Sequence, residues 1–528
     1  MNPGQYEPDP DFVSIFHGFR PLKQRRTNVI KQALKTLIIP LGETTLEEEK
    51  AKGRKMEGTI VLYPTMALGH LVSMVEFGKL ILRHHHHRFS VTIVIAEGPL
   101  DTPDDTAFLR HISETTNSIT FHRLPYISMK PSSNLNRSSI RSEFIHLNNP
   151  NLSHALQTIS KISSVRAFVI DMFCTPALSV ASNLGISTYY FFTSGAVALS
   201  FFLYLPTIHN QTTKSFKDIP TTHVHFPGVP PMPASDLPER VQDREHQIYY
   251  DFIDIGLNLR RSKGIMVNTF KCLESRSIKA ITDGLCVPDA PTPPVYCVGP
   301  LIAAPKNEGE AVSQCMSWLD GQPSQSVVFL SFGSRGVFST AQVRKIAIGL
   351  EKSGQRFLWV VRKPVSEDNS KHFTVENKDP DLEALLPEGF LERNKERGLV
   401  VKSWAPQVEV LGHESVGGFV THCGWNSILE AVSSGVPMVA WPLYAEQRMN
   451  KVFLVEWMKL AMPMEESEDG LVSAAEVEKR VTDLMESEEG RVLRERSRKM
   501  KEEAMAVWSD SGSSMTAFTK LVDSLINQ

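Results

Sequence analysis

Short apolar runs alternate with segments of helical apolar spacing along most of this chain. Residues 59–64 form a run rich in β-branched side chains, and residues 71–82 then place apolar side chains at helical spacing. A second run follows at 89–96, so the order is strand, helix, strand. Because neighbouring parallel strands need such a crossover, the alternation predicts a doubly wound parallel sheet.

The alternation continues and then repeats after a break. Further strands of the first part are predicted at 119–124, 165–170, 187–192 and 264–268, the last of them ending that sheet. Residues 201–225 are less regular. Strands of a second part are predicted at 327–332, 357–361, 418–421 and 437–440, and residues 399–402 lead into the stretch that begins at Trp404. A Pro-rich and then polar stretch separates the two parts, so the chain is expected to hold two α/β domains.

These patterns predict five segments. They are an extension at 1–55, a first domain at 56–298, a linker at 299–314, a second domain at 315–510 and a C-terminal helix at 511–528. The extension is rich in proline and charge and lacks the apolar run of a secretory signal. We therefore expect it to be disordered, with Met56 as the natural start. The polar residues 366–381 are expected to form a mobile loop.

The composition excludes several classes of protein. Hydrophobic residues make up 41% of the chain and charged residues 22%, with a net charge of −3. That charge gives no case for nucleic-acid binding, and no apolar run reaches the roughly 18 residues of a transmembrane helix. The six cysteines show neither a C-x-x-C pair nor zinc spacing. We expect reduced thiols in a cytoplasmic protein.

Three polar side chains follow predicted strands of the first domain. His70 stands where the loop after the first strand meets its helix, Asp171 ends the run at 165–170, and Thr193 follows the run at 187–192. Carboxyl ends of parallel strands line one edge of a sheet, so these side chains should converge. His70 is a candidate general base and Asp171 could fix its tautomer. Each also has a simpler interpretation: His70 could cap its helix, and Asp171 could be a capping or loop carboxylate.

The stretch 404–447 offers a group for the anionic part of a nucleotide sugar. The helix after the strand 418–421 is expected to take Asn426 or Ser427 as its N-cap. Free amides and the helix dipole make such a turn a phosphate site, to which His422 could add a donor. His422 could instead be a packed core histidine.

The same stretch offers groups for the base and the sugars. Trp404 could stack on a base and Gln407 could bond to it, while Glu430 could accept from a ribose diol. Glu446 and Gln447 follow the strand 437–440 and could hold sugar hydroxyls. The stretch therefore predicts a binding site for a nucleotide sugar.

This stretch resembles the signature of the plant family 1 UDP-glycosyltransferases that act on secondary products. The matching positions are Trp404, Ala405, Pro406, Gln407, His422, Cys423, Gly424, Trp425, Asn426, Ser427, Glu430, Pro437, Pro442 and Gln447. Glu446 departs from the pattern, since many members carry Asp there. The resemblance covers about residues 58–528. It implies the α/β fold called GT-B, in which two Rossmann-like domains face across a cleft and a C-terminal helix crosses back.

The resemblance also implies an activity. The first domain would bind the acceptor and the second the UDP-sugar. The enzyme would be an inverting O-glucosyltransferase, a hexosyltransferase that moves glucose from UDP-glucose to a flavonoid-type phenolic of the anthocyanidin, isoflavone or chalcone class. His70 would be the base, Asp171 its partner, and His70 with Ala445 would meet the acceptor. The donor-binding residues would be Thr193, Ser334, Trp404, Ala405, Gln407, His422, Gly424, Trp425, Asn426, Ser427, Glu430, Glu446 and Gln447.

No metal or cofactor is expected beyond UDP-glucose as co-substrate. The D-x-D pairs lie at 9–11 and 379–381, away from strand ends that face the cleft. The partners would be the UDP-sugar and a small phenolic, with no nucleic acid, and we expect a monomer. Two alternatives stay open: a glycosyltransferase of another plant small molecule, or an inactive UDP-sugar-binding protein. The presence of both His70 and Asp171 speaks against the inactive protein.

Overall fold

The computed structural model of the chain describes residues 56–98, 101, 103–129, 137–303, 310–364, 379–467 and 470–527. All of these residues belong to one compact unit, residues 54–528. The predicted extension at 1–55 and most of the predicted loop at 366–381 lie outside the described residues.

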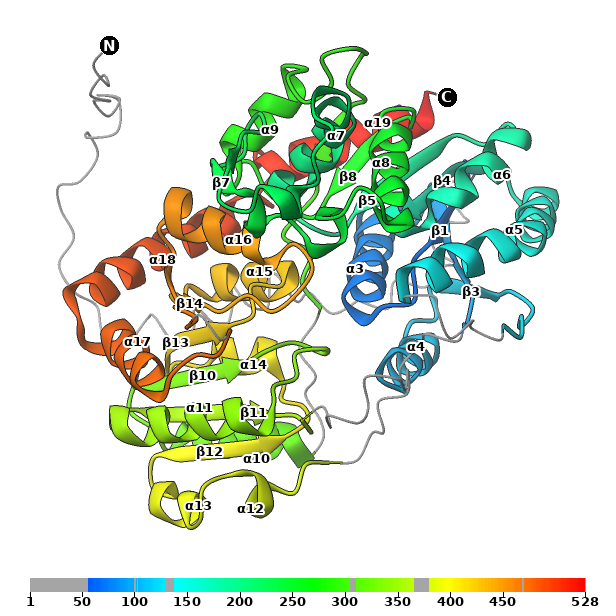
Figure 1. Ribbon diagram of the computed structural model, residues 1–528. Helices are drawn as coiled ribbons and strands as arrows, with labels where there is room; N and C mark the ends of the chain where they lie inside the picture. The colour runs from blue at the N-terminus through cyan, green and yellow to red at the C-terminus, as the bar shows by residue number, and fades with distance from the viewer. Residues whose placement is uncertain are drawn as a thin grey trace, which may run out of the picture. The chain divides into compact units, whose positions relative to one another are not determined.

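A seven-stranded parallel sheet forms the first half of the described chain (Figure 1). Its strands are, in spatial order, β3 (Ile119–Arg123), β2 (Phe89–Ile95), β1 (Gly58–Tyr63), β4 (Val165–Asp171), β5 (Thr188–Phe192), β8 (Ile265–Val267) and β9 (Val295–Cys297). The order reverses between β1 and β4, which pair in parallel. In an open α/β sheet a ligand binds beyond the carboxyl ends of the strands at such a point.

A six-stranded parallel sheet forms the second half. Its strands are, in spatial order, β12 (Gly398–Lys402), β11 (Arg356–Val361), β10 (Val327–Ser331), β13 (Val416–Thr421), β14 (Met438–Ala440) and β15 (Ala461–Pro463). Its order reverses between β10 and β13. A short antiparallel pair, β6 (His223–Val224) and β7 (Met232–Pro233), belongs to neither sheet.

Helices connect the strands of both sheets. In the first half they are α3 (Leu68–His85), α4 (Pro103–Thr115), α5 (Arg137–Ile162), α6 (Leu178–Asn183), α7 (Ala196–Gln211), α8 (Gln247–Leu259) and α9 (Ser275–Thr282). A 3₁₀ segment, η2 (Met172–Ala177), follows β4. In the second half they are α10 (Glu310–Asp320), α11 (Thr340–Ser353), α12 (Leu382–Leu385), α13 (Phe390–Asn394), α14 (Gln407–Gly412), α15 (Trp425–Ser434), α16 (Gln447–Val452), α17 (Ala474–Glu486) and α18 (Glu488–Ala506).

The last helix, α19 (Ser513–Ile526), packs on the first sheet rather than the second. Phe518 and Leu521 lie in one hydrophobic cluster with Phe77 of α3 and Phe191 of β5. Ser514 also donates to the carbonyl of Gly299 at 2.6 Å. The end of the chain therefore contributes to the core of the first half.

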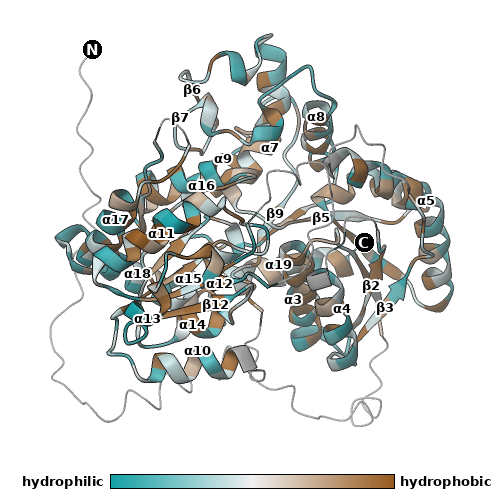
Figure 2. Cartoon of the chain, turned by 60° about the horizontal axis from the view of Figure 1, so that its bottom comes forward, coloured by the Kyte–Doolittle hydropathy of each residue, from teal (hydrophilic) through white to brown (hydrophobic). Residues whose placement is uncertain are grey.

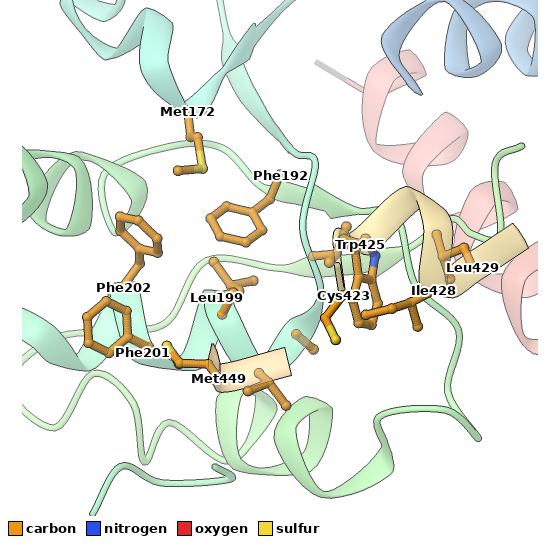
Figure 3. Packing of buried hydrophobic residues seen from close by; sticks show 14 of the residues in the cluster. Met172, Phe192, Leu199, Phe201, Phe202, Cys423, Trp425, Ile428, Leu429 and Met449 are labelled. Carbon is orange, nitrogen blue, oxygen red and sulfur yellow. The ribbon is translucent and has the colours of Figure 1, made fainter. Parts of the chain in front are cut away.

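Hydrophobic burial also joins the two halves. One cluster contains Phe192 and Leu199 of the first half together with Trp425 and Met449 of the second (Figure 3). In Figure 2 the strand β2 is brown, whereas α18 carries long teal stretches on its outer side. None of the described helices is both long and apolar enough to cross a membrane.

Three local predictions are wrong. β9 adds a strand beyond 264–268, although prolines precede it. The less regular residues 201–225 begin inside α7, which is buried on nearly all sides and so lacks an amphipathic pattern. The N-cap of α15 is Gly424, not Asn426 or Ser427. In addition, α10 begins at Glu310, inside the predicted linker 299–314.

Candidate active site

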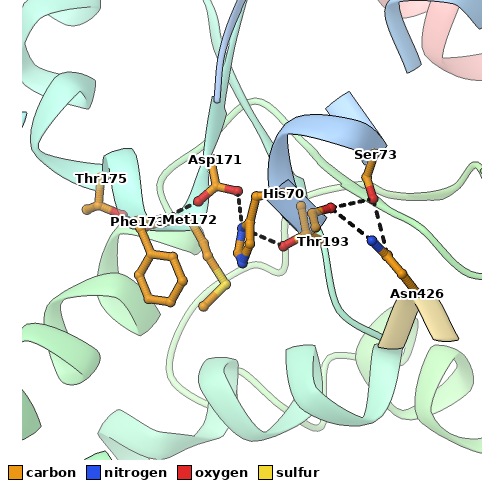
Figure 4. Close-up of polar contacts among 9 residues, drawn as sticks. His70, Ser73, Asp171, Met172, Phe173, Thr175, Thr193 and Asn426 are labelled. Carbon is orange, nitrogen blue, oxygen red and sulfur yellow. Dashed lines mark hydrogen bonds and ion pairs between the residues drawn. The ribbon is translucent and has the colours of Figure 1, made fainter. Parts of the chain in front are cut away.

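His70 and Asp171 meet at the point where the first sheet reverses. His70 lies in the first turn of α3 after β1, and Asp171 is the last residue of β4. Nδ1 of His70 lies 2.6 Å from Oδ2 of Asp171 (Figure 4). The Asp171 side chain is fully buried, whereas the His70 side chain keeps 25% exposure. One side of the imidazole is therefore fixed inside the protein and the other is open.

The bond to Asp171 selects the tautomer of His70. A buried carboxylate accepts, so the proton of a neutral imidazole belongs on Nδ1. Nε2 then carries a lone pair, and no described residue hydrogen-bonds it. The ring also contacts Phe173, with centroids 5.4 Å apart. This arrangement suits a general base whose accepting nitrogen is exposed.

The capping interpretation is wrong for His70 and correct for Asp171. α3 has no side-chain cap, so His70 does not cap its helix. Asp171 does cap η2, because its Oδ1 accepts from the amide of Phe173 at 2.9 Å. Each carboxylate oxygen thus has its own partner, and the capping bond fixes the rotamer that reaches His70.

Thr193 shares the same imidazole nitrogen. It follows β5, and its Oγ1 lies 2.9 Å from Nδ1 of His70. The three predicted side chains from the ends of β1, β4 and β5 are therefore brought together, as the parallel sheet implies.

Asn426 reaches from the second half to the helix that carries His70. Its Nδ2 donates to the carbonyl of Gly69 at 2.9 Å, and its Oδ1 accepts from Ser73 at 3.2 Å (Figure 4). Ser73 also donates to the carbonyl of Gly69. Asn426 therefore holds the first turn of α3 in this structure.

The turn between β13 and α15 has the geometry of an anion-binding cradle. The N-cap Gly424 has no side chain to bond the first amides of α15, which leaves them for a ligand. Cys423 adopts φ +62°, and Asn450 donates to its carbonyl at 3.0 Å. That buried hydrogen bond helps to hold the left-handed conformation.

His422 lies against this cradle as a neutral ring. Burial lowers the pKa of His422 to about 4. A Cβ on Gly333 or on Gly424 would lie 2.4 Å from its Nε2, so both positions need glycine. Its Nδ1 is buried without a partner among the described residues. A buried nitrogen without a partner is unusual, and a bound ligand is one way to satisfy it.

Glu430 and Gln407 lie side by side within the second half. Gln407 donates to Glu430 at 2.6 Å and to Ser427 at 2.8 Å. Burial raises the pKa of Glu430 to about 7; the Gln407 bond lowers it and Glu409 raises it further. The carboxyl is therefore poised near neutral pH.

Other predicted donor residues differ in exposure. Trp404 keeps 40% exposure, whereas Ala405 is buried. Ser334 is exposed on the loop after β10. Ala445 is also exposed and adopts φ +57°.

Gln447 and Trp425 are largely engaged by protein groups. Oε1 of Gln447 accepts from the amides of Leu443 and Tyr444, both at 2.9 Å. Nε1 of Trp425 donates to the carbonyl of Asn268 at 2.7 Å, and its ring is buried. Trp425 therefore anchors α15 to the first half in this structure.

Four residues that join the halves or support the site escaped the sequence analysis. They are Ser73, Ser194, Asn268 and Glu274. Glu274 is fully buried, and burial raises the pKa of its carboxyl; it accepts from the amides of Ala196 and Val197 at the start of α7. Polar and charged residues flank Glu274 in the sequence, so no local pattern marked it. The other three carry no signal either, because they act through contacts distant in sequence.

A cavity of about 310 Å³ lies beside Phe173, between α5, η2 and α8. Phe252 and Ile255 are among its apolar walls, and Arg141 and Gln247 among its polar ones. Phe173 thus borders both the cavity and the His70 ring. Such a volume is within the range of small-molecule sites.

Comparisons with known proteins agree on a family. The family model described as UDP-glucoronosyl and UDP-glucosyl transferase matches residues 288–488. UDP-glycosyltransferase 88F4 of Malus domestica is 53% identical over 481 residues, covering 89% of this chain and 100% of that protein. Phloretin 2'-O-glucosyltransferase of Malus domestica is 52% identical over 483 residues, with coverage of 89% and 100%.

A solved structure extends the agreement to the fold. Phytolacca americana UGT2, complexed with UDP-2fluoro-glucose and pterostilbene, has 37% identity and a TM-score of 0.79, covering 89% of this chain and 100% of that one. With the two parallel sheets described above, this confirms the predicted GT-B fold. The chain therefore belongs to the UDP-glycosyltransferase family and is a UDP-dependent glycosyltransferase.

Proposed function

We propose that this protein transfers glucose from UDP-glucose to a hydroxyl of a flavonoid-type phenolic, with inversion at the anomeric carbon. The observation that carries the proposal is the 2.6 Å contact between His70 and Asp171. It leaves the other nitrogen of an exposed imidazole free to take a proton. A protein that only bound UDP-sugars would have no need of that arrangement.

The base would act on the acceptor. Nε2 of His70 takes the phenolic proton while the phenolic oxygen attacks C1 of glucose. The buried carboxylate of Asp171 stabilises the imidazolium that forms, and Thr193 keeps the ring in place. Attack from the face opposite UDP breaks the bond between C1 and the phosphate oxygen and inverts the configuration.

The second half would stabilise the leaving UDP. The bond electrons pass to the β-phosphate, whose charge is met by the first amides of α15 with His422 and Ser334. Preorganised donors of this kind often supply the largest share of a rate enhancement. Trp404 would stack on the uracil, Glu430 would accept from the ribose, and Glu446 with Gln447 would hold the glucose.

The acceptor class is inferred from two observations. The cavity beside Phe173 has apolar walls with polar groups among them, which suits an aromatic ring bearing hydroxyls. The relatives include an enzyme named for phloretin and a structure that contains pterostilbene, both two-ring phenolics. We extend that chemistry to this chain, with the second ring in the cavity.

We further propose a cytoplasmic monomer that needs no metal. All six cysteines are unpaired, which suits a reducing compartment. Among the described residues no three His, Cys, Asp or Glu side chains could jointly hold an ion. Full activity after EDTA treatment, and elution as a single chain, would support these points; loss of activity restored by a divalent cation would contradict the metal-free mechanism.

The test of the function is an acceptor screen. The purified chain is incubated with UDP-glucose and a panel of chalcones, dihydrochalcones, isoflavones, anthocyanidins and non-phenolic alcohols. A mass gain of one hexose on a phenolic, with a β-glucoside by NMR, is expected. Products only on non-phenolic alcohols would favour another small-molecule glycosyltransferase, and UDP binding without any product would favour an inactive binder.

A further inference from the structure

One hydrogen bond links the predicted sugar-binding loop to the first half of the molecule. Ser194, just after β5, donates through Oγ to Oε1 of Glu446 at 3.0 Å. Ser194 is 8% exposed, and Glu446 immediately precedes α16. The two residues are 252 positions apart in the chain.

The loop around Glu446 is otherwise held from within the second half. Oε1 of Gln447 accepts from the amides of Leu443 and Tyr444, which fixes the turn. Ala445 adopts φ +57°, a conformation that persists only in a constrained backbone. The Glu446 side chain is the exception, because its hydrogen bond comes from the other half.

The bond occupies only one oxygen of Glu446. Oε2 forms no hydrogen bond with any described residue. An ionised carboxylate has room for several donors, so Oε2 remains able to accept from a ligand hydroxyl. Fixing one oxygen restricts the rotamers of a long side chain and so lowers the entropy cost of binding through the other.

Ser194 also adjoins the proposed catalytic group. Its neighbour Thr193 contacts Nδ1 of His70 at 2.9 Å. Two consecutive residues after β5 therefore touch the candidate base and the candidate sugar-binding carboxylate. Because Thr193 and Ser194 are adjacent on one backbone, they fix how far the candidate base lies from the candidate sugar-binding carboxylate.

We propose that Ser194 is a positioning residue that aims Glu446 at the hydroxyls of the donor sugar and aligns that sugar with His70. This inference rests on the proposed function, because it assumes a UDP-linked hexose in the site. It also explains the use of the longer side chain. Aspartate at 446 would retract the carboxylate by about 1.5 Å, the length of one carbon–carbon bond. It would then lose the hydrogen bond from Ser194.

The experiment compares UDP-glucose with UDP, which lacks the sugar. Dissociation constants are measured by calorimetry for the unmodified enzyme, Ser194→Ala, Glu446→Ala, Glu446→Asp and the double variant Ser194→Ala/Glu446→Ala. Ser194→Ala is expected to weaken UDP-glucose about tenfold, the usual scale for one hydrogen bond to a charged group, and to leave UDP unchanged. Glu446→Asp should likewise weaken the binding of UDP-glucose about tenfold and leave the binding of UDP unchanged.

Two further readouts separate positioning from a structural role. In the Glu446→Ala background, Ser194→Ala should add little, because its effect passes through the carboxylate. Ser194→Thr, which keeps a hydroxyl, should restore most of the affinity. Ser509→Ala removes an exposed serine hydroxyl far along the chain and should bind both ligands like the unmodified enzyme.

Equal losses for UDP and UDP-glucose, fully additive losses in the double variant, or an unchanged Ser194→Ala would each overturn the inference. The proposed function fails separately, if the unmodified enzyme does not turn over UDP-glucose. If the unmodified enzyme is active and Ser194→Ala binds UDP-glucose equally well, only the proposed role of Ser194 is contradicted.

Discussion

The two halves of the molecule build their parts of the site in different ways. The first half supplies single side chains from the ends of three strands, and His70 and Asp171 are separated by 101 positions. The second half supplies one continuous stretch, from Trp404 to Gln447, in which a strand end and a helix start carry most groups. The first arrangement depends on sheet order, whereas the second depends on local geometry.

The difference also shows in where the side chains are held. Gln407 donates to both Ser427 and Glu430 within the second half. Asn426, Trp425 and Glu446, in contrast, form side-chain hydrogen bonds with the first half. The continuous stretch therefore has two parts: one forms the proposed nucleotide site, and the other fixes the halves to each other around His70.

The largest expected effect separates chemistry from binding. His70→Ala should lower kcat by about 10²- to 10⁴-fold, the usual contribution of a positioned general base. The Kd for UDP should not change, because the protein groups proposed to bind UDP lie in the second half. His154→Ala, at an exposed histidine of α5, is the control and should keep full activity. Substantial transfer by His70→Ala would remove it from the base role.

The next effect concerns the attachment between the halves. Trp425→Phe keeps the aromatic ring but removes the bond to the carbonyl of Asn268, leaving a buried acceptor unpaired. We expect a loss of about 1–3 kcal/mol in the free energy of unfolding, measured by urea titration. Tyr126→Phe removes the hydroxyl of a residue that is 74% exposed and should shift this free energy by less than about 0.5 kcal/mol. Similar losses in both variants would contradict the anchoring role of Trp425.

A smaller effect tests how the second half reads the sugar. Gln447→Glu keeps an oxygen for the amides of Leu443 and Tyr444 but replaces the amide NH₂. If that NH₂ donates to glucose, KM for UDP-glucose should rise about tenfold, as for one lost hydrogen bond. Affinity for UDP should stay the same. An unchanged KM would confine Gln447 to holding its loop.

The smallest effect is a pH dependence within the second half. The pKa of Glu430 is raised to about 7, so the carboxyl gains a proton as pH falls through that value. The protonated form accepts less well, and the Kd for UDP-glucose should rise a few-fold at lower pH. Glu430→Gln should abolish the dependence, and the same midpoint in that variant would assign it to another group.

The same group should affect stability in the opposite direction. Its folded pKa lies above the usual value of a glutamate, so the protonated folded form is favoured. The stabilisation is present in full below the ordinary glutamate pKa and is lost as pH rises through about 7. Unfolding curves of the unmodified protein and Glu430→Gln should therefore differ most above that pH.

The sequence by itself determined the two-part α/β fold and the nucleotide-sugar stretch. Buried parallel strands appear as short apolar runs, and a strand end followed by a helix start predicts an anion site from local geometry alone. It also predicted that His70, Asp171 and Thr193 would converge, because parallel strand ends share an edge. It missed α7, which is apolar all round, and β9, which follows a run of prolines.

Only the tertiary structure decided which side chains join the halves. Asn426 on Gly69, Trp425 on Asn268 and Glu446 on Ser194 pair residues that are at least 157 positions apart. Such pairs produce no periodic pattern in the sequence, because hydrogen bonds between distant segments depend on how two sheets pack and not on local spacing. The same holds for Trp425, which the resemblance predicts as donor-binding and whose ring hydrogen bond to Asn268 no sequence pattern indicated.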